Sequence, residues 1–401
     1  MTRLRETIFI IAFTFAAFVL GTTEYVIVGL LKDISATLSI SLAAAGVLVS
    51  CFAIAYALGT PLAVTLLGRI PRHVTILSAY IAVLVFNYLT IFATTYPVML
   101  FIRIITAILC GLTLSLAIAA TSEHMSASRR AGAVAWIIGG FSIANVLGVP
   151  VGTQIGQMAG WQTAFIVTSL VGIIPLAFML AVMPKSNTIS VSSMKQQFAL
   201  FKNQRIRLAF FIPVFGVGSV FIVYTYITPL LENVLGIPQQ WISTVLLAYG
   251  AFTILSNWLG AKVAQGNSRV KLKVIFTIQA MIMTALALTL SLQWMALASL
   301  MLVACFSFAL STAVQLYLID LADESSPGSK DFASTLMPVA SNMGIALGSL
   351  LGSLVVDSIG LAYLPWAAIA FAIGAFVITS RCHQLDQEQS ELTLLTSVKA
   401  S

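Results

Sequence analysis

Uncharged apolar runs of about twenty residues recur along almost the whole chain, and this pattern constrains the fold more than any other feature. A membrane-spanning helix needs about 20 such residues, whereas a membrane β-barrel shows short segments of alternating polarity. Charged residues make up only 8% of the chain, far below the roughly 25% of a soluble domain. The sequence therefore predicts an all-α protein with many membrane-spanning helices.

We expect twelve spans, because charged residues and glycine- or proline-containing breaks separate the apolar runs. The longest polar segment, 184–207, is a predicted cytoplasmic linker between an N-terminal six-helix bundle (1–183) and a C-terminal one (208–380). Residues 381–401 form the predicted tail. The spans are expected at 7–31, 42–67, 73–93, 97–122, 130–156, 161–183, 208–231, 241–264, 271–291, 294–321, 332–356 and 361–380.

The placement of basic residues predicts the orientation in the membrane. With the N-terminus inside, 18 of the 20 Lys and Arg residues fall in cytoplasmic segments, Lys32 lies outside and Arg103 lies within a span. Cytoplasmic loops of membrane proteins carry such an excess, so both termini are expected in the cytoplasm, at the inner (plasma) membrane. The net charge of +7 then reflects these loops and not a nucleic-acid partner.

The two halves repeat with a shift of about 200 residues, which is typical of transporters built from parallel repeats. Three glycines of the first half, Gly148, Gly152 and Gly160, align with Gly348, Gly352 and Gly360. The repeat is asymmetric in charge, because Glu24 and Arg103 align with uncharged residues. We therefore expect the N-terminal half to handle an ion.

Glu24 is the only charged residue between Ile8 and Leu31. Burying an ionised carboxylate alone costs several kcal/mol or more, so this group must be paired, protonated or facing water. Arg103 is expected at a matching depth, about 9 Å from the outer end of its helix, compared with about 10 Å for Glu24. A carboxylate beside a guanidinium can couple substrate binding to proton transfer. The alternatives are a structural ion pair, or an Arg103 bonded to backbone carbonyls while Glu24 faces water.

The fifth and eleventh predicted spans are rich in glycine, which lets helix backbones approach closely and slide. Pro150 removes a backbone hydrogen bond and should bend its helix. Ordinary packing of small residues would give the same pattern in each helix taken alone. The candidate packing residues are Gly139, Gly148, Pro150, Gly152, Gly156, Gly344, Gly348 and Gly352.

Amides and phenols within the spans could line a cavity for a polar solute, although each is individually more typical of a helix–helix hydrogen bond. The expected cavity residues are Tyr25, Asn145, Tyr224, Gln315 and Asn342. Charged residues at the cytoplasmic helix ends could close that side, or could serve only to set the topology. The candidate residues of this cytoplasmic gate are Gly59, Arg69, Arg72, Glu123 and Asp323.

Motifs of enzymes and ATP-driven pumps are absent from the sequence. It contains no GxxxxGK[ST], no HExxH and no GxSxG. The four cysteines and three histidines do not have metal-ligand spacing. We therefore expect no enzymatic activity, no metal and no cofactor, with the proton gradient as the energy source.

Several of these motifs resemble those of the twelve-helix drug:H+ antiporter family of the major facilitator superfamily, including its arabinose- and purine-efflux-like members. The resemblance runs from GTTEYVIVGLL in the first span to GLAYLPWA in the last. The fourth-span motif is similar to FIRIITAILCG, which contains Arg103 and Gly111. The helix 5 antiporter motif matches at Gly139, Gly148, Gly152 and Gly156, but departs from it at Thr153 and Gln157, and Pro150 is displaced. The helix 2–3 motif keeps Gly59, Arg69 and Arg72, while its usual aspartate is missing near Ala63.

The resemblance implies two six-helix bundles that rock around a central cavity. It also implies export of a small organic solute, such as a drug, sugar or purine nucleoside, in exchange for protons, with Glu24 exchanging the proton and Arg103 tuning it. A monomer is expected. The alternatives are a facilitated or proton-symport permease for a sugar or nucleoside and, less favoured, a membrane sensor that does not transport.

Overall fold

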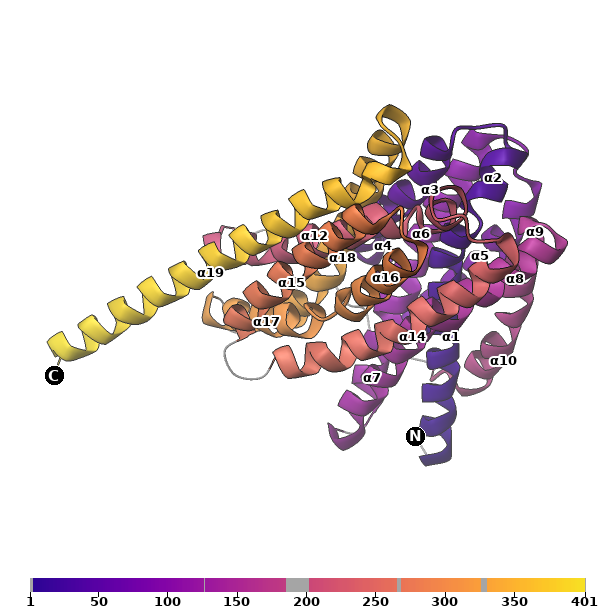
Figure 1. Ribbon diagram of the computed structural model, residues 1–401. Coiled ribbons are helices and arrows are strands. Elements are labelled where there is room, and N and C mark those ends of the chain that lie inside the picture. Colours follow the sequence, from indigo (N-terminus) through magenta and orange to yellow (C-terminus); the bar gives the residue numbers. More distant parts are fainter. Residues whose placement is uncertain (1–2, 126, 185–201, 265–267, 326–329, 401) are drawn as a thin grey trace. The chain divides into compact units, whose positions relative to one another are not determined.

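The computed structural model describes residues 3–125, 127–184, 202–264, 268–325 and 330–400. Within these ranges the chain forms helices and short connections, and no strand is present (Figure 1). Twelve of the helices are long and apolar enough to cross a membrane. This confirms both the all-α fold and the predicted number of spans.

Six spans come from the N-terminal half of the chain, and several of them are broken into pieces. A short helix α2 (Leu31–Thr37) follows the first span. The six spans are α1 (Arg3–Gly29); α3 (Leu42–Ile54), η1 (Ala55–Gly59) and α4 (Thr60–Leu66); α5 (Arg72–Leu89) with η2 (Thr90–Phe92); α6 (Tyr96–His124); α7 (Ala127–Ile143), η3 (Ala144–Gly148) and α8 (Val149–Ala159); and α9 (Trp161–Val171) with α10 (Ile173–Val182).

The C-terminal half supplies the other six. Two short elements, α13 (Ile227–Pro229) and η4 (Leu230–Val234), follow its first span, and η5 (Leu361–Tyr363) begins its last. The six spans are α12 (Gln204–Tyr224), α14 (Gln239–Val263), α15 (Ser268–Thr289), α16 (Gln293–Phe306) with α17 (Ser311–Ser325), α18 (Lys330–Ser358) and α19 (Leu364–Ala400).

The chain packs as two compact units. Unit 1 contains residues 1–192 together with 224–251 and 356–361, and unit 2 contains 193–223, 252–355 and 362–401. The segment 224–251, which comprises α13, η4 and the first half of α14, therefore packs within unit 1. Most of the predicted linker at 184–207 lies outside the described residues, so the division into two bundles at that point stays a prediction.

Two π turns interrupt the second and fifth spans, and each is followed by a proline. Proline has no N–H, so Pro61 and Pro150 deprive the carbonyls four residues before them of their usual donor. The π turns η1 and η3 lie over these positions, and in η3 the Val149 N–H bonds to the Ala144 carbonyl, five residues back. The local break expected at Pro150 thus takes the form of a π turn just before it.

Two predicted span limits were wrong. The seventh span ends at Tyr224 and not at residue 231. Pro229 cannot donate to the Thr225 carbonyl, and the chain turns at Thr225 and Tyr226 before helix resumes. The twelfth helix runs on to Ala400, so most of the predicted tail is helical.

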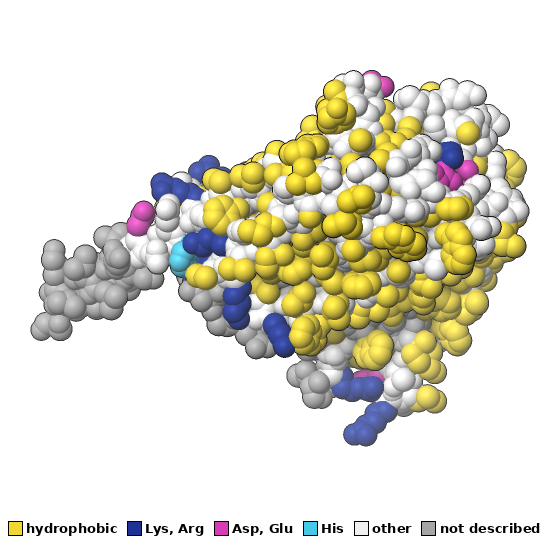
Figure 2. Space-filling view, in the orientation of Figure 1, with side chains coloured by type: hydrophobic (Ala, Val, Ile, Leu, Met, Phe, Trp, Pro, Cys, Tyr) yellow, Lys and Arg dark blue, Asp and Glu magenta, His cyan; other side chains and the backbone are white. Residues whose placement is uncertain are grey.

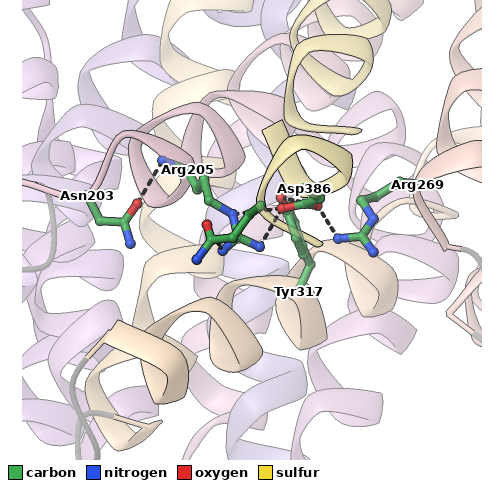
Figure 3. Close-up of polar contacts among 6 residues, drawn as sticks. Asn203, Arg205, Arg269, Tyr317 and Asp386 are labelled. Atoms are coloured by element: carbon green, nitrogen blue, oxygen red, sulfur yellow. Dashed lines mark hydrogen bonds and ion pairs between the residues drawn. The ribbon is translucent and has the colours of Figure 1, made fainter. Parts of the chain in front are cut away.

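One carboxylate ties four helices of unit 2 together at one end (Figure 3). Asp386 of α19 is buried, and its Oδ1 accepts hydrogen bonds from Arg205 of α12, with Nε at 2.7 Å and Nη2 at 2.5 Å. Its Oδ2 accepts from Arg269 of α15 and, at 2.9 Å, from the Tyr317 hydroxyl of α17. Two guanidinium groups therefore share one buried carboxylate.

Replacing Asp386 by asparagine should destabilise unit 2, because two partly buried guanidinium groups lose their counter-charge. The Arg205 and Arg269 side chains are 14% and 32% exposed, so we expect a loss of about 1–3 kcal/mol rather than the full cost of breaking a buried pair. Thermal unfolding of the purified protein in detergent measures the effect, with the exposed Glu388→Gln as control. An unchanged melting temperature for Asp386→Asn would contradict this assignment.

Candidate functional site

Glu24 lies in the membrane-spanning part of α1 and is almost completely buried, with 5% of its surface exposed. Its Oε2 is buried and has no hydrogen-bond partner. The carboxylate does form a side-chain hydrogen bond with its neighbour Tyr25. An acidic group in such dry surroundings is costly to ionise, so its charge can change only when a proton or a partner arrives.

Arg103 of α6 lies beside Glu24 but bonds to the backbone of α1. Its Nη1 donates to the Thr23 carbonyl at 2.7 Å, and its Nη2 donates to the Glu24 carbonyl at 3.1 Å. The guanidinium also lies over the ring of Phe52, 4.1 Å from its centroid. No ion pair joins the two side chains, both of which the structure describes. Of the alternatives considered from the sequence, the structure agrees with the one in which Arg103 is bonded to backbone carbonyls. It differs from that alternative in one respect, since Glu24 is buried and does not face water.

Three of the five predicted cavity residues come together in unit 1. The Tyr224 hydroxyl donates to Asn145 Oδ1 at 2.7 Å, and Tyr25 lies close enough to Tyr224 to interact with it electrostatically. Sequence reasoning missed Tyr249, whose ring stacks on Tyr224 with centroids 5.2 Å apart, and Tyr56, which lies near Glu24. Phenols thus gather around the carboxylate and the amide.

The other two predicted cavity residues, Gln315 and Asn342, belong to unit 2. Gln315 of α17 is half-buried. Asn342 of α18 donates from Nδ2 to the Pro338 carbonyl in its own helix at 3.2 Å, while its buried Oδ1 has no hydrogen-bond partner. A role for them in a shared cavity stays a prediction.

Glycines of the fifth span form a close seam with α1, and each faces a side chain one turn further along that helix. A Cβ on Gly148 would lie 2.2 Å from Thr22 Oγ1, and a Cβ on Gly152 would lie 2.3 Å from Val26 Cγ2. One on Gly156 would lie 2.3 Å from Leu30 Cδ2. Only glycine leaves room for these side chains directly against the backbone of the fifth span.

Gly139, predicted to lie on the packing face, does not. A Cβ there would meet nothing within 4 Å, whereas one on the next residue, Gly140, would lie 2.1 Å from the Thr14 carbonyl oxygen. One residue rotates the position by about 100° around the helix, which moves it off the contact. The equivalent seam in unit 2 brings α18 against α12, where a Cβ on Gly348 would lie 2.3 Å from the Gly218 carbonyl oxygen. Gly352 is also buried.

Gly140→Ala and Gly139→Ala form a matched pair of substitutions that tests the seam. The first forces backbone away from backbone and should cost about 1–3 kcal/mol of stability. The second fills open space in a helix and should be neutral or stabilise by up to about 1 kcal/mol. Thermal unfolding of both purified variants, alongside the parent, measures the difference. Equal melting temperatures for the two would show that the seam is not as tight as described.

The predicted cytoplasmic gate is only partly described. Gly59 allows close approach of η1 to α6, since a Cβ there would lie 2.4 Å from Ile108 Cγ1. Arg69 is exposed, and Arg72 is half-buried at the edge of a small pocket between α4, α5 and α6. The side chains of Glu123 and Asp323 lie outside the described part of the chain, so their role stays a prediction.

Sequence reasoning missed the contacts at the far end of α1. Lys32 Nζ lies 2.5 Å from Glu232 Oε2, and the Thr228 hydroxyl donates to the Val28 carbonyl at 3.3 Å. A Cβ on Gly46 would lie 1.8 Å from the hydroxyl oxygen of Tyr226. Segment 224–234 is thus held against α1 and α3 within unit 1. The signal in the sequence was Lys32, the only basic residue expected outside.

Asp33, next to Lys32, provides a pH-dependent test of this end. Burial raises the pKa of its carboxyl, and the nearby Glu232 carboxylate raises it further. An acid with a raised pKa in the folded state is most favourable to stability below its unfolded pKa, and it loses that contribution as the pH rises through the folded pKa. Asp33→Asn should therefore raise the melting temperature at neutral pH and bring no gain at pH values where Asp33 is protonated.

The control is Asp357→Asn, which removes an exposed carboxylate elsewhere in unit 1. It should leave the melting temperature unchanged at both pH values. A lower melting temperature for Asp33→Asn at neutral pH would mean that attraction to Lys32 outweighs the two effects above.

No group of three His, Cys, Asp or Glu side chains in the described residues could hold a metal ion. Cys110, Cys305 and Cys382 are buried, Cys51 is half-buried, and none forms a disulfide.

The residues that gather around Glu24 in unit 1 offer an acid, a buried cation, phenols and an amide. Such a set can bind a small polar molecule and exchange a proton.

Comparison with known proteins identifies the family. Residues 13–329 match the Major Facilitator Superfamily. The chain belongs to this superfamily of transporters. The uncharacterized MFS-type transporter YtbD of Bacillus subtilis (strain 168) is 32% identical over 371 residues, which cover 92% of this chain and 94% of YtbD.

Other relatives carry more specific names. The inner membrane transport protein YdhP of Escherichia coli (strain K12) is 28% identical, covering 89% of this chain and 91% of YdhP. A probable sugar efflux transporter of Mannheimia succiniciproducens is 26% identical, covering 92% of this chain and 91% of that protein. The chain is thus a multi-pass membrane transporter, similar along most of its length to these proteins.

Solved structures confirm the fold. A bacterial homolog of the human lysosomal transporter Spinster, in an inward-facing conformation, superimposes with a TM-score of 0.76 at 16% identity, covering 96% of this chain and 98% of that one. A D-xylose-proton symporter gives a TM-score of 0.74 at 16% identity, covering 93% and 97% of the two chains. At these identities the likeness extends to the fold alone.

Proposed function

We propose that this transporter exports a small organic solute in exchange for protons, with Glu24 as the proton carrier. The observation that carries the proposal is the state of the Glu24 side chain: it is buried in a membrane-spanning helix with one carboxylate oxygen unpartnered. The neighbouring cation, Arg103, is held by backbone carbonyls instead. A proton is the simplest partner that such a carboxylate can gain and lose during a transport cycle.

The surroundings of Glu24 support a substrate site at the same place. Tyr25 bonds to the carboxylate, and Tyr224 and Asn145 lie beyond Tyr25. Phenols and an amide suit a polar organic molecule better than a simple ion. The substrate class proposed, a drug, sugar or purine nucleoside, is the one that the resemblance to the antiporter family implies. The name of the Mannheimia relative, a probable sugar efflux transporter, is consistent with the export direction.

The proposed cycle uses the two glycine seams and requires no cofactor beyond the proton gradient. In this cycle the fifth span shifts along α1, where its glycines lie directly against α1 side chains such as Thr22 and Val26, and α18 shifts along α12, where Gly348 lies against the Gly218 backbone. In the proposed orientation both termini face the cytoplasm, and the Lys32 end of unit 1 faces outwards. The chain works as a monomer in this proposal.

Glu24→Gln should abolish solute-driven proton movement in everted membrane vesicles. In vesicles with an acidified lumen and a pH-sensitive dye, substrate added to the parent protein should release protons from the lumen. The amide cannot carry a proton, so we expect at least a tenfold loss of this signal, which corresponds to about 1.4 kcal/mol or more. The solutes to compare are amphenicol-like drugs, lipophilic cations, arabinose-like sugars and purine nucleosides.

Glu388→Gln makes the same carboxylate-to-amide change at an exposed site and should retain the signal. A folded Glu24→Gln variant that remains fully active would contradict the proposed proton carrier. Movement of labelled solute without any proton signal in the parent protein would instead support a facilitated permease for a sugar or nucleoside.

A further inference from the structure

Two guanidinium groups share the Asp386 carboxylate at one end of unit 2. Arg205 and Arg269 together carry two charges, and Asp386 supplies one in return. Arg269 also lies over the Tyr317 ring, with its guanidinium carbon 5.2 Å from the centroid. Its Nε is buried and has no hydrogen-bond partner. Arg269 therefore shares its carboxylate partner with a second arginine, as Figure 3 shows.

Two further basic side chains lie beside Arg269, where α15 packs along α19. His383 of α19 interacts electrostatically with both Arg269 and Lys273 of α15. The buried Nδ1 of His383 has no hydrogen-bond partner. Within the described part of the chain, the Lys273 ammonium has no ion-pair partner either. We call Arg269, Lys273 and His383 the α15–α19 basic cluster, and Figure 2 shows Lys and Arg side chains beside a histidine near the last described side chains of α19.

Large apolar side chains are exposed on the same two helices, beside Arg269 and Lys273 on α15 and about one to three turns before His383 on α19. On α15 they are Val270 and Val274, which are 41% and 54% exposed. On α19 they are Ile373 and Val377, which are 51% and 57% exposed. In a membrane-spanning helix such side chains lie against lipid acyl chains. A basic cluster thus borders a lipid-facing surface made by the same helices.

We propose that the α15–α19 basic cluster binds the headgroup of an anionic phospholipid. The phosphodiester supplies a negative charge and acceptor oxygens for Lys273, and further negative charge for Arg269, which shares Asp386 with Arg205. The acyl chains run along the exposed valines and isoleucine of α15 and α19. A soluble anion would satisfy the charge but would gain nothing from the apolar surface, so the continuity of the two surfaces favours a lipid.

Lipid retention by the full-length protein tests this inference. The purified parent protein, Lys273→Gln and Lys262→Gln are each incubated with phosphatidylglycerol or phosphatidylcholine, and bound lipid is counted by native mass spectrometry. Lys262 is the matched control, because it is a basic residue of unit 2 whose ammonium lies over the Trp258 ring, 3.8 Å from its centroid. We expect Lys273→Gln to weaken phosphatidylglycerol binding at least threefold and Lys262→Gln to leave it unchanged.

Three results would overturn the inference. Equal weakening by the two variants would mean that lipid responds to overall charge and not to this cluster. Equal retention of phosphatidylcholine by the parent protein would mean that the headgroup charge is not recognised. Full displacement of phosphatidylglycerol by millimolar inorganic phosphate, with the same dependence on Lys273, would assign the site to a soluble anion. Melting temperatures of both variants serve to show that each is folded.

Discussion

The hydrogen bonds from Arg103 to the backbone of α1 are the contact on which the proposed site depends. The carbonyls of Thr23 and Glu24 each accept a hydrogen bond from one terminal nitrogen of this buried guanidinium, while its Nε has no partner. Because the hydrogen bonds of Arg103 go to the backbone, the Glu24 side chain forms no ion pair with it. The charge of that carboxylate can then be set by a proton, while the arginine fixes the position of the helix that carries it.

Helix α1 also packs against most of the other N-terminal spans, namely α3, α6, the fifth span (α7, η3 and α8) and the sixth (α9 and α10). Glycines of the fifth span follow one side of it, and segment 224–234 contacts its far end through Val28 and the neighbouring Lys32. A change at Glu24 therefore occurs in a helix that is held at one end by polar contacts and along its side by glycines that lie directly against its side chains. In the proposed cycle the glycines let the two helices shift against each other, and the Lys32–Glu232 ion pair can break and re-form.

Hydropathy was enough to predict the twelve helices, since each needs its own apolar run of membrane length. The contacts of single residues were less predictable. Matching depths placed Arg103 next to Glu24. Depth alone cannot tell whether Arg103 donates to the Glu24 carboxylate or to the backbone carbonyls beside it, because both lie at about the same level in the membrane. Gly139 and Gly140 are neighbours in the sequence and differ only in the side of the helix on which they lie. Which of these sides contacts α1 depends on how the two helices pack, and the sequence does not show it. Asp386 was missed because it follows the predicted end of the last span, where hydropathy falls although the helix continues.

The central claim is that Glu24 holds a proton that substrate displaces. Proton release on substrate binding tests it most directly, with purified protein in weakly buffered detergent solution and a pH-sensitive dye. The account predicts that substrate releases protons from the parent protein and releases none from a folded Glu24→Gln variant that still binds the substrate. Equal release from both proteins would contradict the account, because the exchangeable proton would then reside on another group.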